Sequence, residues 1–387
     1  MTNLLAAQPK ACIDGTHRAR PPQETFRWIE PMLPEFGITR VADVTWLDDL
    51  GVPVYQAIRP DSWTLCVSQG KGLTDAHAKV SAAMESIELW HGERTPAAPR
   101  TGTPRELAGE LGYRMDELNL PPRTAVHQDM RLDWSPATVI GADTQSWVPR
   151  ALVAMDSRMG DEWCVPLFEQ SSNGLASGNT LTEAVLHGLY EVVERDALSR
   201  HPAAMSTEDS LVALDTLEGA PAELVAQIQA AGVHVAIAHL PSETGLPVFL
   251  ARIRGDSLAI TFGGSGCHLD REVALCRALT EAAQSRVTVI AGARDDIRSM
   301  RYARAELAGR GGDADPLAAA SPTGRLDYTR IPTVRTTDLA EDLPLTAAMV
   351  VRATGNDAVF VDHTRPEYGI PVVHVFCPGM KFDPTHA

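Results

Sequence analysis

Residues 171–200 read SSNGLASGNTLTEAVLHGLYEVVERDALSR, a turn rich in Gly, Ser and Asn followed by a long helical pattern from about residue 181. Thr180 lies three residues before Glu183, which is the spacing of a capping box at the start of a helix. The rest of this helix is largely apolar, so we expect it to be packed. Residues at i, i+4 and i+7 share one helical face, and here they are His187, Glu191 and Glu194.

The same spacing of polar residues occurs in two other segments. Residues 70–93 read GKGLTDAHAKVSAAMESIELWHGE and residues 266–286 read GCHLDREVALCRALTEAAQSR. Each helical pattern follows a Gly-containing turn, and an alanine precedes each first glutamate by seven residues (Ala78, Ala184 and Ala274). The recurrence suggests a pseudo-repeat of three helices. The aligned polar residues of the two additional segments are Ser81, Glu85 and Glu88, and Arg277, Glu281 and Gln284.

Carboxylates on packed helices are costly unless a cation or strong hydrogen-bond donors meet them. Four glutamates on two helices could hold one or two hard cations, and Mg²⁺ suits such a site because it pairs a few carboxylates with phosphate oxygens. Arg195 and Arg286 are natural partners for phosphate. The alternative is a solvated helix face without a ligand, which the shared register of three helices disfavours. Gly70-Lys71-Gly72 does not match a Walker P-loop, and no G-x-G-x-x-G precedes a helix.

The composition excludes several classes of protein. The 387 residues include 34 Lys and Arg against 50 Asp and Glu, giving a net charge of −16 and a pI near 5.2. This balance argues against a general binder of nucleic acid or of acidic membranes. We find no secretory signal and no stretch of apolar residues long enough to span a membrane. The six cysteines are scattered without a C-x-x-C pair, and we expect a soluble cytoplasmic chain without a structural zinc site.

Hydrophobic patterning predicts an α+β (mixed α/β) fold, because strands and helices interleave without regular βαβ spacing. We expect loops at 94–104 and 201–210, turns at 173–179 and 263–268, and a mobile loop at 309–324. Helices are predicted at about 24–33, 75–93, 181–199 and 271–286, with a short helix after residue 210. Strands are predicted at about 40–45, 52–59, 64–68, 137–140, 147–154, 233–239, 248–254, 258–262, 358–362 and 371–376.

The quoted segments resemble the YcaO family. The combination of S-A-x-x-E-x-x-E with N-T-x-x-E-A-x-x-x-G-L-x-E-x-x-E-R-D is specific, and the resemblance runs from about Lys10 to the C-terminal Pro-Gly. It implies a YcaO-like fold of sheets flanked by helices, with an ATP and Mg²⁺ site between the helices. We expect residues 1–60 to form an N-terminal segment packed on a catalytic domain of residues 61–387.

The resemblance also implies a chemistry and a set of site residues. In this family a nucleophile adds to a backbone amide of a peptide, ATP phosphorylates the resulting oxyanion, and phosphate leaves. Carried over by motif, the metal ligands would be Glu85, Glu88, Glu191 and Glu194. The residues contacting ATP would be Ser81, His187, Arg195 and Arg286, joined by Lys10 and Thr16. His187 departs from the family pattern, where an amide side chain is often found, and the sequence does not identify a catalytic base.

The N-terminal part looks like YcaO proteins that work with a TfuA partner, where sulfide is the nucleophile and a thioamide is the product. The C-terminus, HVFCPGMKFDPTHA, lacks the P-x-P-x-P tail of many azoline-forming members. We therefore predict thioamide formation on a ribosomally made precursor peptide by a homodimer, with a separate leader-recognition protein delivering the substrate. The alternatives are azoline or macroamidine formation by a cyclodehydratase, and a non-catalytic nucleotide-binding scaffold.

Overall fold

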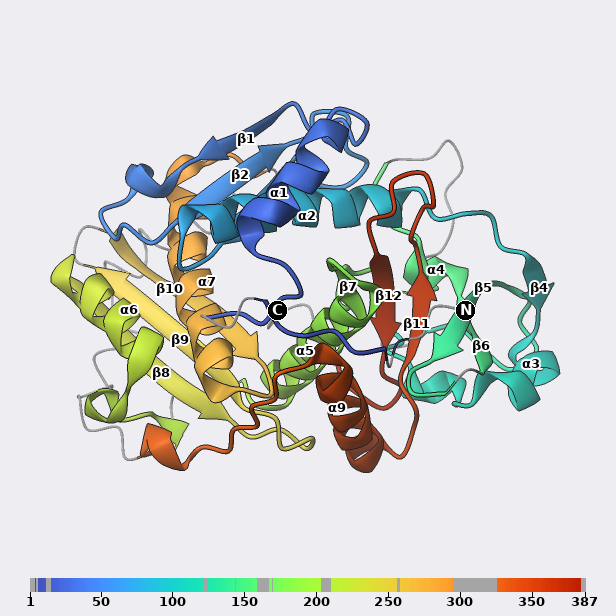
Figure 1. The fold of residues 1–387 in the computed structure, drawn as a ribbon. Helices are drawn as coiled ribbons and strands as arrows, with labels where there is room; N and C mark the ends of the chain where they lie inside the picture. The colour runs from blue at the N-terminus through green and yellow to red at the C-terminus, as the bar shows by residue number, and fades with distance from the viewer. Residues whose placement is uncertain are drawn as a thin grey trace.

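The molecule combines three antiparallel sheets with helices packed against them (Figure 1). This mixed α and β architecture is the predicted fold class. The computed structural model describes all of the chain except residues 1–3, 5, 12–14, 122–123, 143, 159–166, 169, 203–209, 256–257, 295–325 and 384–387. The segment 309–324, predicted to be a mobile loop, lies outside the described residues, as does most of the expected loop at 201–210.

The first sheet is a three-stranded meander that leads into a long helix. Its strands are β1 (Arg40–Asp43), β2 (Val54–Ile58) and β3 (Val67–Lys71). Helix α2 (Asp75–Glu93) follows, with its start capped by Thr74 and with α1 (Pro22–Ile29) packed on it. The predicted division at residue 60 stays a prediction, and β1 and β2 pair with β3 across it.

The second sheet repeats this arrangement. Its strands are β8 (Val233–Leu240), β9 (Val248–Gly255) and β10 (Leu258–Cys267), and they precede α7 (Arg271–Ala291). Helix α6 (Gly219–Ala230) packs against both the sheet and α7. The predicted turn at 263–268 is wrong, because β10 continues through Cys267. Its glycines pair with β9 in regular register.

The third sheet has six strands. In spatial order they are β4 (Arg100–Gly102), β5 (Leu132–Val139), β11 (Val359–Asp362), β12 (Val372–Phe376) and β7 (Leu175–Ser177), and β6 (Gln145–Pro149) also pairs with β5. The helices associated with it are α3 (Pro104–Leu111), α4 (Arg150–Val153), α5 (Leu181–Arg200) and α9 (Leu339–Thr354).

Several short or irregular elements differ from the sequence-based expectation. The strand predicted at 147–154 is wrong in its second half, which forms α4. Strand β4 lies inside the segment predicted as a loop at 94–104, and β7 lies inside the predicted turn at 173–179. Both have three residues, too few for alternation to be visible. Helix α3 was not predicted, and α9 contains Pro344, which interrupts the helical pattern in the sequence.

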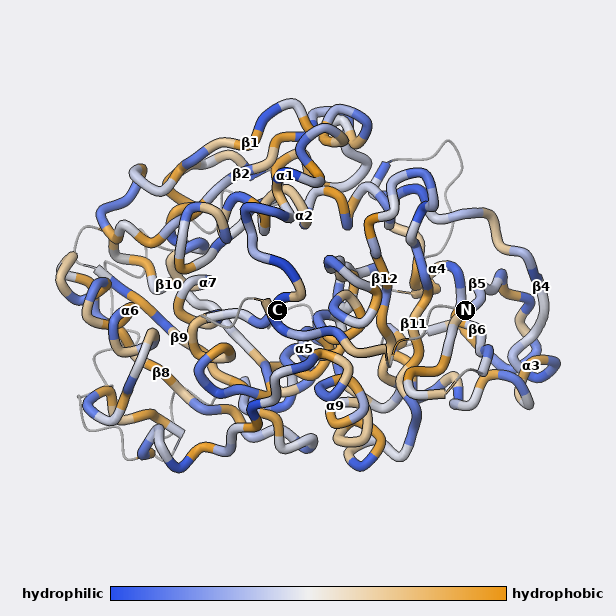
Figure 2. The backbone as a smooth tube through the Cα atoms, in the orientation of Figure 1, coloured by the Kyte–Doolittle hydropathy of each residue, from blue (hydrophilic) through white to orange (hydrophobic). Residues whose placement is uncertain are grey.

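Apolar side chains collect where the long helices meet the sheets. Figure 2 shows strands β11 and β12 largely in orange, whereas the helices alternate between orange, white and blue. Separate core clusters surround α5, α7 and α2. In the described part of the chain, none of the helices combines the length and apolar character that crossing a membrane would require.

Candidate active site

The two meander-and-helix units pack strand against helix through glycine. An added Cβ at Gly70 would collide with the backbone of Ala78 and Ala82 on α2. At Gly266 it would collide with the backbone of Ala274 on α7 in the same way. Since Ala78 and Ala274 are the aligned alanines of the predicted repeat, the recurrence in the sequence corresponds to a recurrence in the packing of strand on helix.

This close packing lets a strand amide reach a helix carboxylate. Gln69 N donates to Glu85 Oε2 at 3.3 Å, and Ser265 N donates to Glu281 Oε1 at 3.5 Å. In both cases the donor lies 16 residues before the glutamate. The first glutamate of α2 and the corresponding glutamate of α7 are therefore held by the strand that precedes each helix.

Two other glutamates connect the helices to neighbouring units. Glu88 Oε1 accepts hydrogen bonds from Ser177 N at 2.8 Å and from Ser177 Oγ at 2.5 Å, which ties α2 to β7. Glu194 Oε1 accepts from Ser265 Oγ at 2.7 Å, which ties α5 to β10. The glutamate-bearing faces of α2, α5 and α7 are thus brought into one region by contacts between distant segments.

The electrostatics of this region favour a bound cation. Burial raises the pKa of Glu85, and it raises the pKa of Glu88 to about 8 and that of Glu191 to about 7. The charges of Glu85 and Glu191 raise the pKa of Glu88 further. Buried carboxyls that repel one another hold protons near neutral pH, and a cation among them would favour their ionised form.

Two side-chain cations lie among the carboxylates. Lys71 Nζ is 2.5 Å from Glu281 Oε2, and Arg195 Nη1 is 3.4 Å from Glu194 Oε1. Burial would raise the pKa of Glu281, but the charges of Lys71 and Arg195 outweigh it and hold this pKa below its usual value. The Lys71 and Glu281 side chains are each about a quarter exposed, at 24% and 23%. Both therefore remain accessible to a ligand.

A small pocket adjoins these helices and contains two of the predicted nucleotide-binding residues, Thr16 and His187. Thr16, Arg18, His187 and Arg277 are among its lining residues. His187 Nδ1 is buried and has no hydrogen-bond partner among the described residues, and burial followed by the charge of Arg277 lowers its pKa well below the usual range. The imidazole is therefore neutral and has an unused polar atom for a ligand.

The remaining predicted residues have different surroundings. Ser81 lies on α2, one turn before Glu85, and is partly exposed. Lys10 Nζ is 2.7 Å from Asp342 Oδ2, and Arg286 Nε is 2.7 Å from Asp48 Oδ2; both pairs are buried. Asp342 also lines the small pocket, so Lys10 lies behind its wall. The ion pair of Arg286 with Asp48 links α7 to the segment that precedes β2.

Sequence reasoning missed three polar residues of this region as site residues. Glu281 belongs to the repeat and aligns with Glu85, so its position in the repeat could have identified it as a site residue. Lys71 lies in the Gly-Lys-Gly segment, which the sequence analysis tested only as a possible P-loop. Its place as the last residue of β3 was therefore not considered. Ser177 carries no local signal, because its contact with Glu88 joins segments 89 residues apart.

The chemistry of these donors fits magnesium and a nucleotide. Buried carboxylate oxygens are the ligands that hard cations take, and the raised pKa values indicate an unmet need for positive charge. Across the described ranges, no three His, Cys, Asp or Glu side chains already converge as a metal site. The glutamates instead accept hydrogen bonds from Gln69, Ser177 and Ser265, so binding would require their carboxyl groups to rearrange.

Comparison with known proteins yields one family. The family model that matches covers residues 69–381 and is described as YcaO cyclodehydratase, ATP- and Mg²⁺-binding. An uncharacterized protein of Mycobacterium tuberculosis is 41% identical over 372 residues, covering 95% of this chain and 83% of that protein. A protein of Rhizobium leguminosarum bv. trifolii, named for its place in the tfuA 3′ region, is 36% identical over 382 residues, covering 96% and 90%.

Solved structures share the fold at low sequence identity. YcaO from Methanopyrus kandleri, bound with AMPPCP and Mg²⁺, superposes with a TM-score of 0.71 at 24% identity, covering 97% of this chain and 95% of that one. A heterocyclase in complex with substrate and cofactor gives a TM-score of 0.78 at 23% identity, covering 97% of this chain and 54% of that chain.

Proposed function

The chain belongs to the YcaO family, whose domain binds ATP and Mg²⁺, and from this premise we propose that it activates a backbone amide of a ribosomally made precursor peptide. The product we propose is a thioamide, formed with a TfuA-like partner. One observation carries the proposal: glutamates from α2 and α5 meet in a buried region where their pKa values are raised. That region suits Mg²⁺ with a phosphorylated ligand.

The residues divide into two groups in this proposal. Glu85, Glu88, Glu191 and Glu194 hold Mg²⁺, which when bound supplies positive charge to the phosphate oxygens. The residues that contact ATP are Ser81, His187, Arg195 and Arg286, with Lys10 and Thr16. Arg286 and Lys10 are each paired with an aspartate in this structure, so they reach ATP only if these pairs open.

The chain's own groups supply positioning and electrostatics. Arg195 and Lys71 carry positive charge beside the glutamates, where negative charge develops when an oxyanion is phosphorylated. His187 is neutral, so its ring can donate one hydrogen bond without adding charge. Partial burial of this region lowers the local dielectric constant, which strengthens each of these interactions.

The relative named for the tfuA 3′ region supports sulfide as the nucleophile. Azoline or macroamidine formation is the second candidate, because the matching family model is described as a cyclodehydratase and one structural neighbour is a heterocyclase. The two candidates share amide activation and differ only in the nucleophile.

Mass spectrometry separates the candidates. The purified chain is incubated with a precursor peptide, a TfuA-like partner, ATP, Mg²⁺ and sulfide, and the peptide mass is measured. We expect a gain in mass from exchange of oxygen for sulfur, with release of phosphate. Loss of one water without sulfur would replace thioamidation by cyclodehydration. ATP binding without phosphate release, with partner and peptide present, would instead identify a scaffold.

A further inference from the structure

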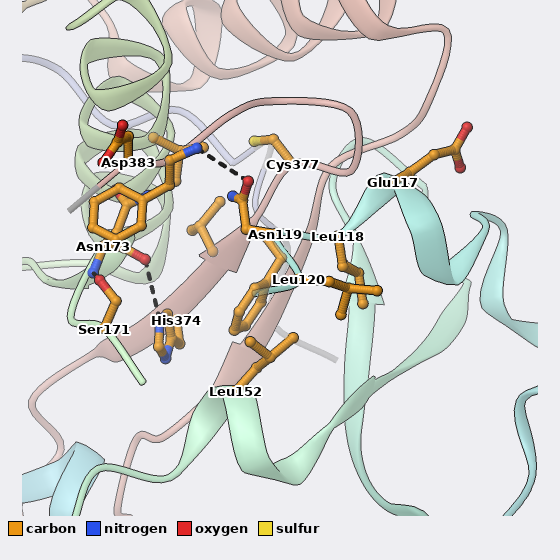
Figure 3. Close-up of a pocket in the computed structure, with 14 residues that line it drawn as sticks. Glu117, Leu118, Asn119, Leu120, Leu152, Ser171, Asn173, His374, Cys377 and Asp383 are labelled. Carbon is orange, nitrogen blue, oxygen red and sulfur yellow. Dashed lines mark hydrogen bonds between the residues drawn. The ribbon is translucent and has the colours of Figure 1, made fainter. Parts of the chain in front are cut away.

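The C-terminal tail is held through its backbone by side chains. Lys381 N donates to Asp196 Oδ1 at 2.7 Å, Phe382 N to Asn119 Oδ1 at 3.0 Å, and Asp383 N to Ser199 Oγ at 2.8 Å. Three consecutive peptide N–H groups are thus bound by side-chain oxygens. The second of these contacts lies at the rim of a pocket (Figure 3).

This pocket of about 340 Å³ opens to solvent between the tail, β12 and the segment around residue 119. Leu118 and Leu152 lie on one side of it, with Asn173 and Asp383 across from them in Figure 3. Its described lining contains aliphatic and aromatic carbon, two acidic residues and no Lys or Arg. That composition suits an apolar group and disfavours a phosphate or carboxylate ligand.

One buried acceptor of the pocket is unused. Asn173 Oδ1 is buried and has no hydrogen-bond partner among the described residues. The adjoining Asn173 carbonyl accepts from the ring of His374, whose side chain is 1% exposed, at 3.1 Å. Buried acceptors are normally paired. On the other side of the pocket an asparagine oxygen already accepts a peptide N–H, that of Phe382.

We propose that this pocket is an exosite for the precursor peptide, which inserts an apolar side chain and donates the neighbouring backbone N–H to Asn173 Oδ1 after the Asn173 side chain turns toward the pocket. The inference rests on the proposed function, since it assumes a peptide substrate. The proposed contact has the same form as the contact of the tail, in which a peptide N–H donates to a side-chain oxygen beside apolar residues.

The position of the pocket explains how it would serve the active site. Asn173 precedes β7, and β7 ends at Ser177, which donates to Glu88. The four residues from Asn173 to Ser177 span at most about 13 Å if extended. Since the residues of β7 are buried, a peptide held at the pocket would reach the carboxylates by passing around β7, over a span longer than this.

The test uses N-acetyl-phenylalaninamide as a probe on the full chain with ¹³C-labelled leucine methyl groups. We expect saturable shifts of the Leu118, Leu120 and Leu152 methyl resonances. Methyl 3-phenylpropionate, which has the ring but no amide N–H, should bind at least about fivefold more weakly. Asn173→Leu should remove this preference for the amide, and Leu152→Trp, which fills the pocket, should abolish binding of both probes.

Mg-ATP binding is measured on the same samples, both to show that each variant is folded and to separate the two ideas. If the wild type binds Mg-ATP but not the probe, the exosite proposal is wrong and the proposed function stands. The same conclusion follows if Leu152→Trp binds the probe as well as the wild type does. If the probe binds only after deletion of residues 384–387, the pocket is a site for the C-terminus of this chain, and the exosite proposal is wrong. Loss of Mg-ATP binding by the folded wild type counts against the proposed function instead.

Discussion

Binding of Mg-ATP should release protons, and the number follows from the carboxyl groups of the site. At pH 7 a carboxyl with a pKa of about 8, as for Glu88, is about nine-tenths protonated, and one with a pKa of about 7, as for Glu191, is about half protonated. Metal ligands must be ionised, so binding at pH 7 should release about 1.4 protons in total. The raised pKa of Glu85 can only add to this number.

The sign of the pH dependence follows from the same values. The free protein carries the extra protons, so the apparent affinity for Mg-ATP should increase as the pH rises. The slope should be about 1.4 decades per pH unit near pH 7 and should flatten above about pH 9, where both carboxyls are ionised without metal.

Calorimetry in buffers of different ionisation enthalpy measures the proton number directly. Glu88→Gln keeps an oxygen that can accept from Ser177 but removes the ionisable group, so the release should fall to about 0.5. The matched control is Glu223→Gln on an exposed position of α6, which should leave the number unchanged. Tight Mg-ATP binding with an enthalpy independent of the buffer would refute the reasoning, because the ligands would then be ionised already or located elsewhere.

Lys71→Met should weaken Mg-ATP binding about tenfold with little change in Tm, because the partly exposed ion pair of Lys71 with Glu281 adds little to folding. An unchanged affinity in calorimetry would show that Lys71 is not part of the site. Glu93→Gln should lower the free energy of unfolding by about 3–5 kcal/mol in denaturant titrations, since Arg59 is buried against it at 2.5 Å. A loss below 1 kcal/mol would contradict this. Gly70→Ala should reduce both Tm and nucleotide affinity, since β3 must move off α2; a variant with wild-type values would show that the strand shifts freely.

Much of the local structure was readable from the sequence. The predicted helix at 75–93 matches α2 residue for residue, and α5 begins at Leu181 as expected. Thr180 caps α5 by accepting from Glu183 N, as the spacing predicts. The Glu183 carboxylate does not complete the box on Thr180, because it accepts from Asn179 and Ala19 instead. Local spacing predicted the cap, and tertiary contacts determined where the carboxylate points.

The interactions that assemble the candidate site were not readable in the same way. The Lys71–Glu281 pair joins residues 210 positions apart, and no periodic pattern encodes which segments meet at that distance. The repeat did indicate that Glu85 and Glu281 occupy equivalent positions, because spacing on a helix is local information. The assignment of magnesium ligands among the glutamates stays a prediction.

The glycine contacts at Gly70 and Gly266 have a consequence for divergence. Each places a strand backbone directly against a helix backbone, at Ala78 and at Ala274. The positions of Glu85 and Glu281, two helical turns further along, therefore depend on contacts between main chains rather than on the shapes of neighbouring core side chains. Core residues around such a crossing can be exchanged over many generations while the carboxylates keep their places. This is consistent with structures that superpose over nearly the whole chain at 23–24% identity. At each crossing a glycine on the strand and an alanine on the helix allow this direct contact of main chain with main chain.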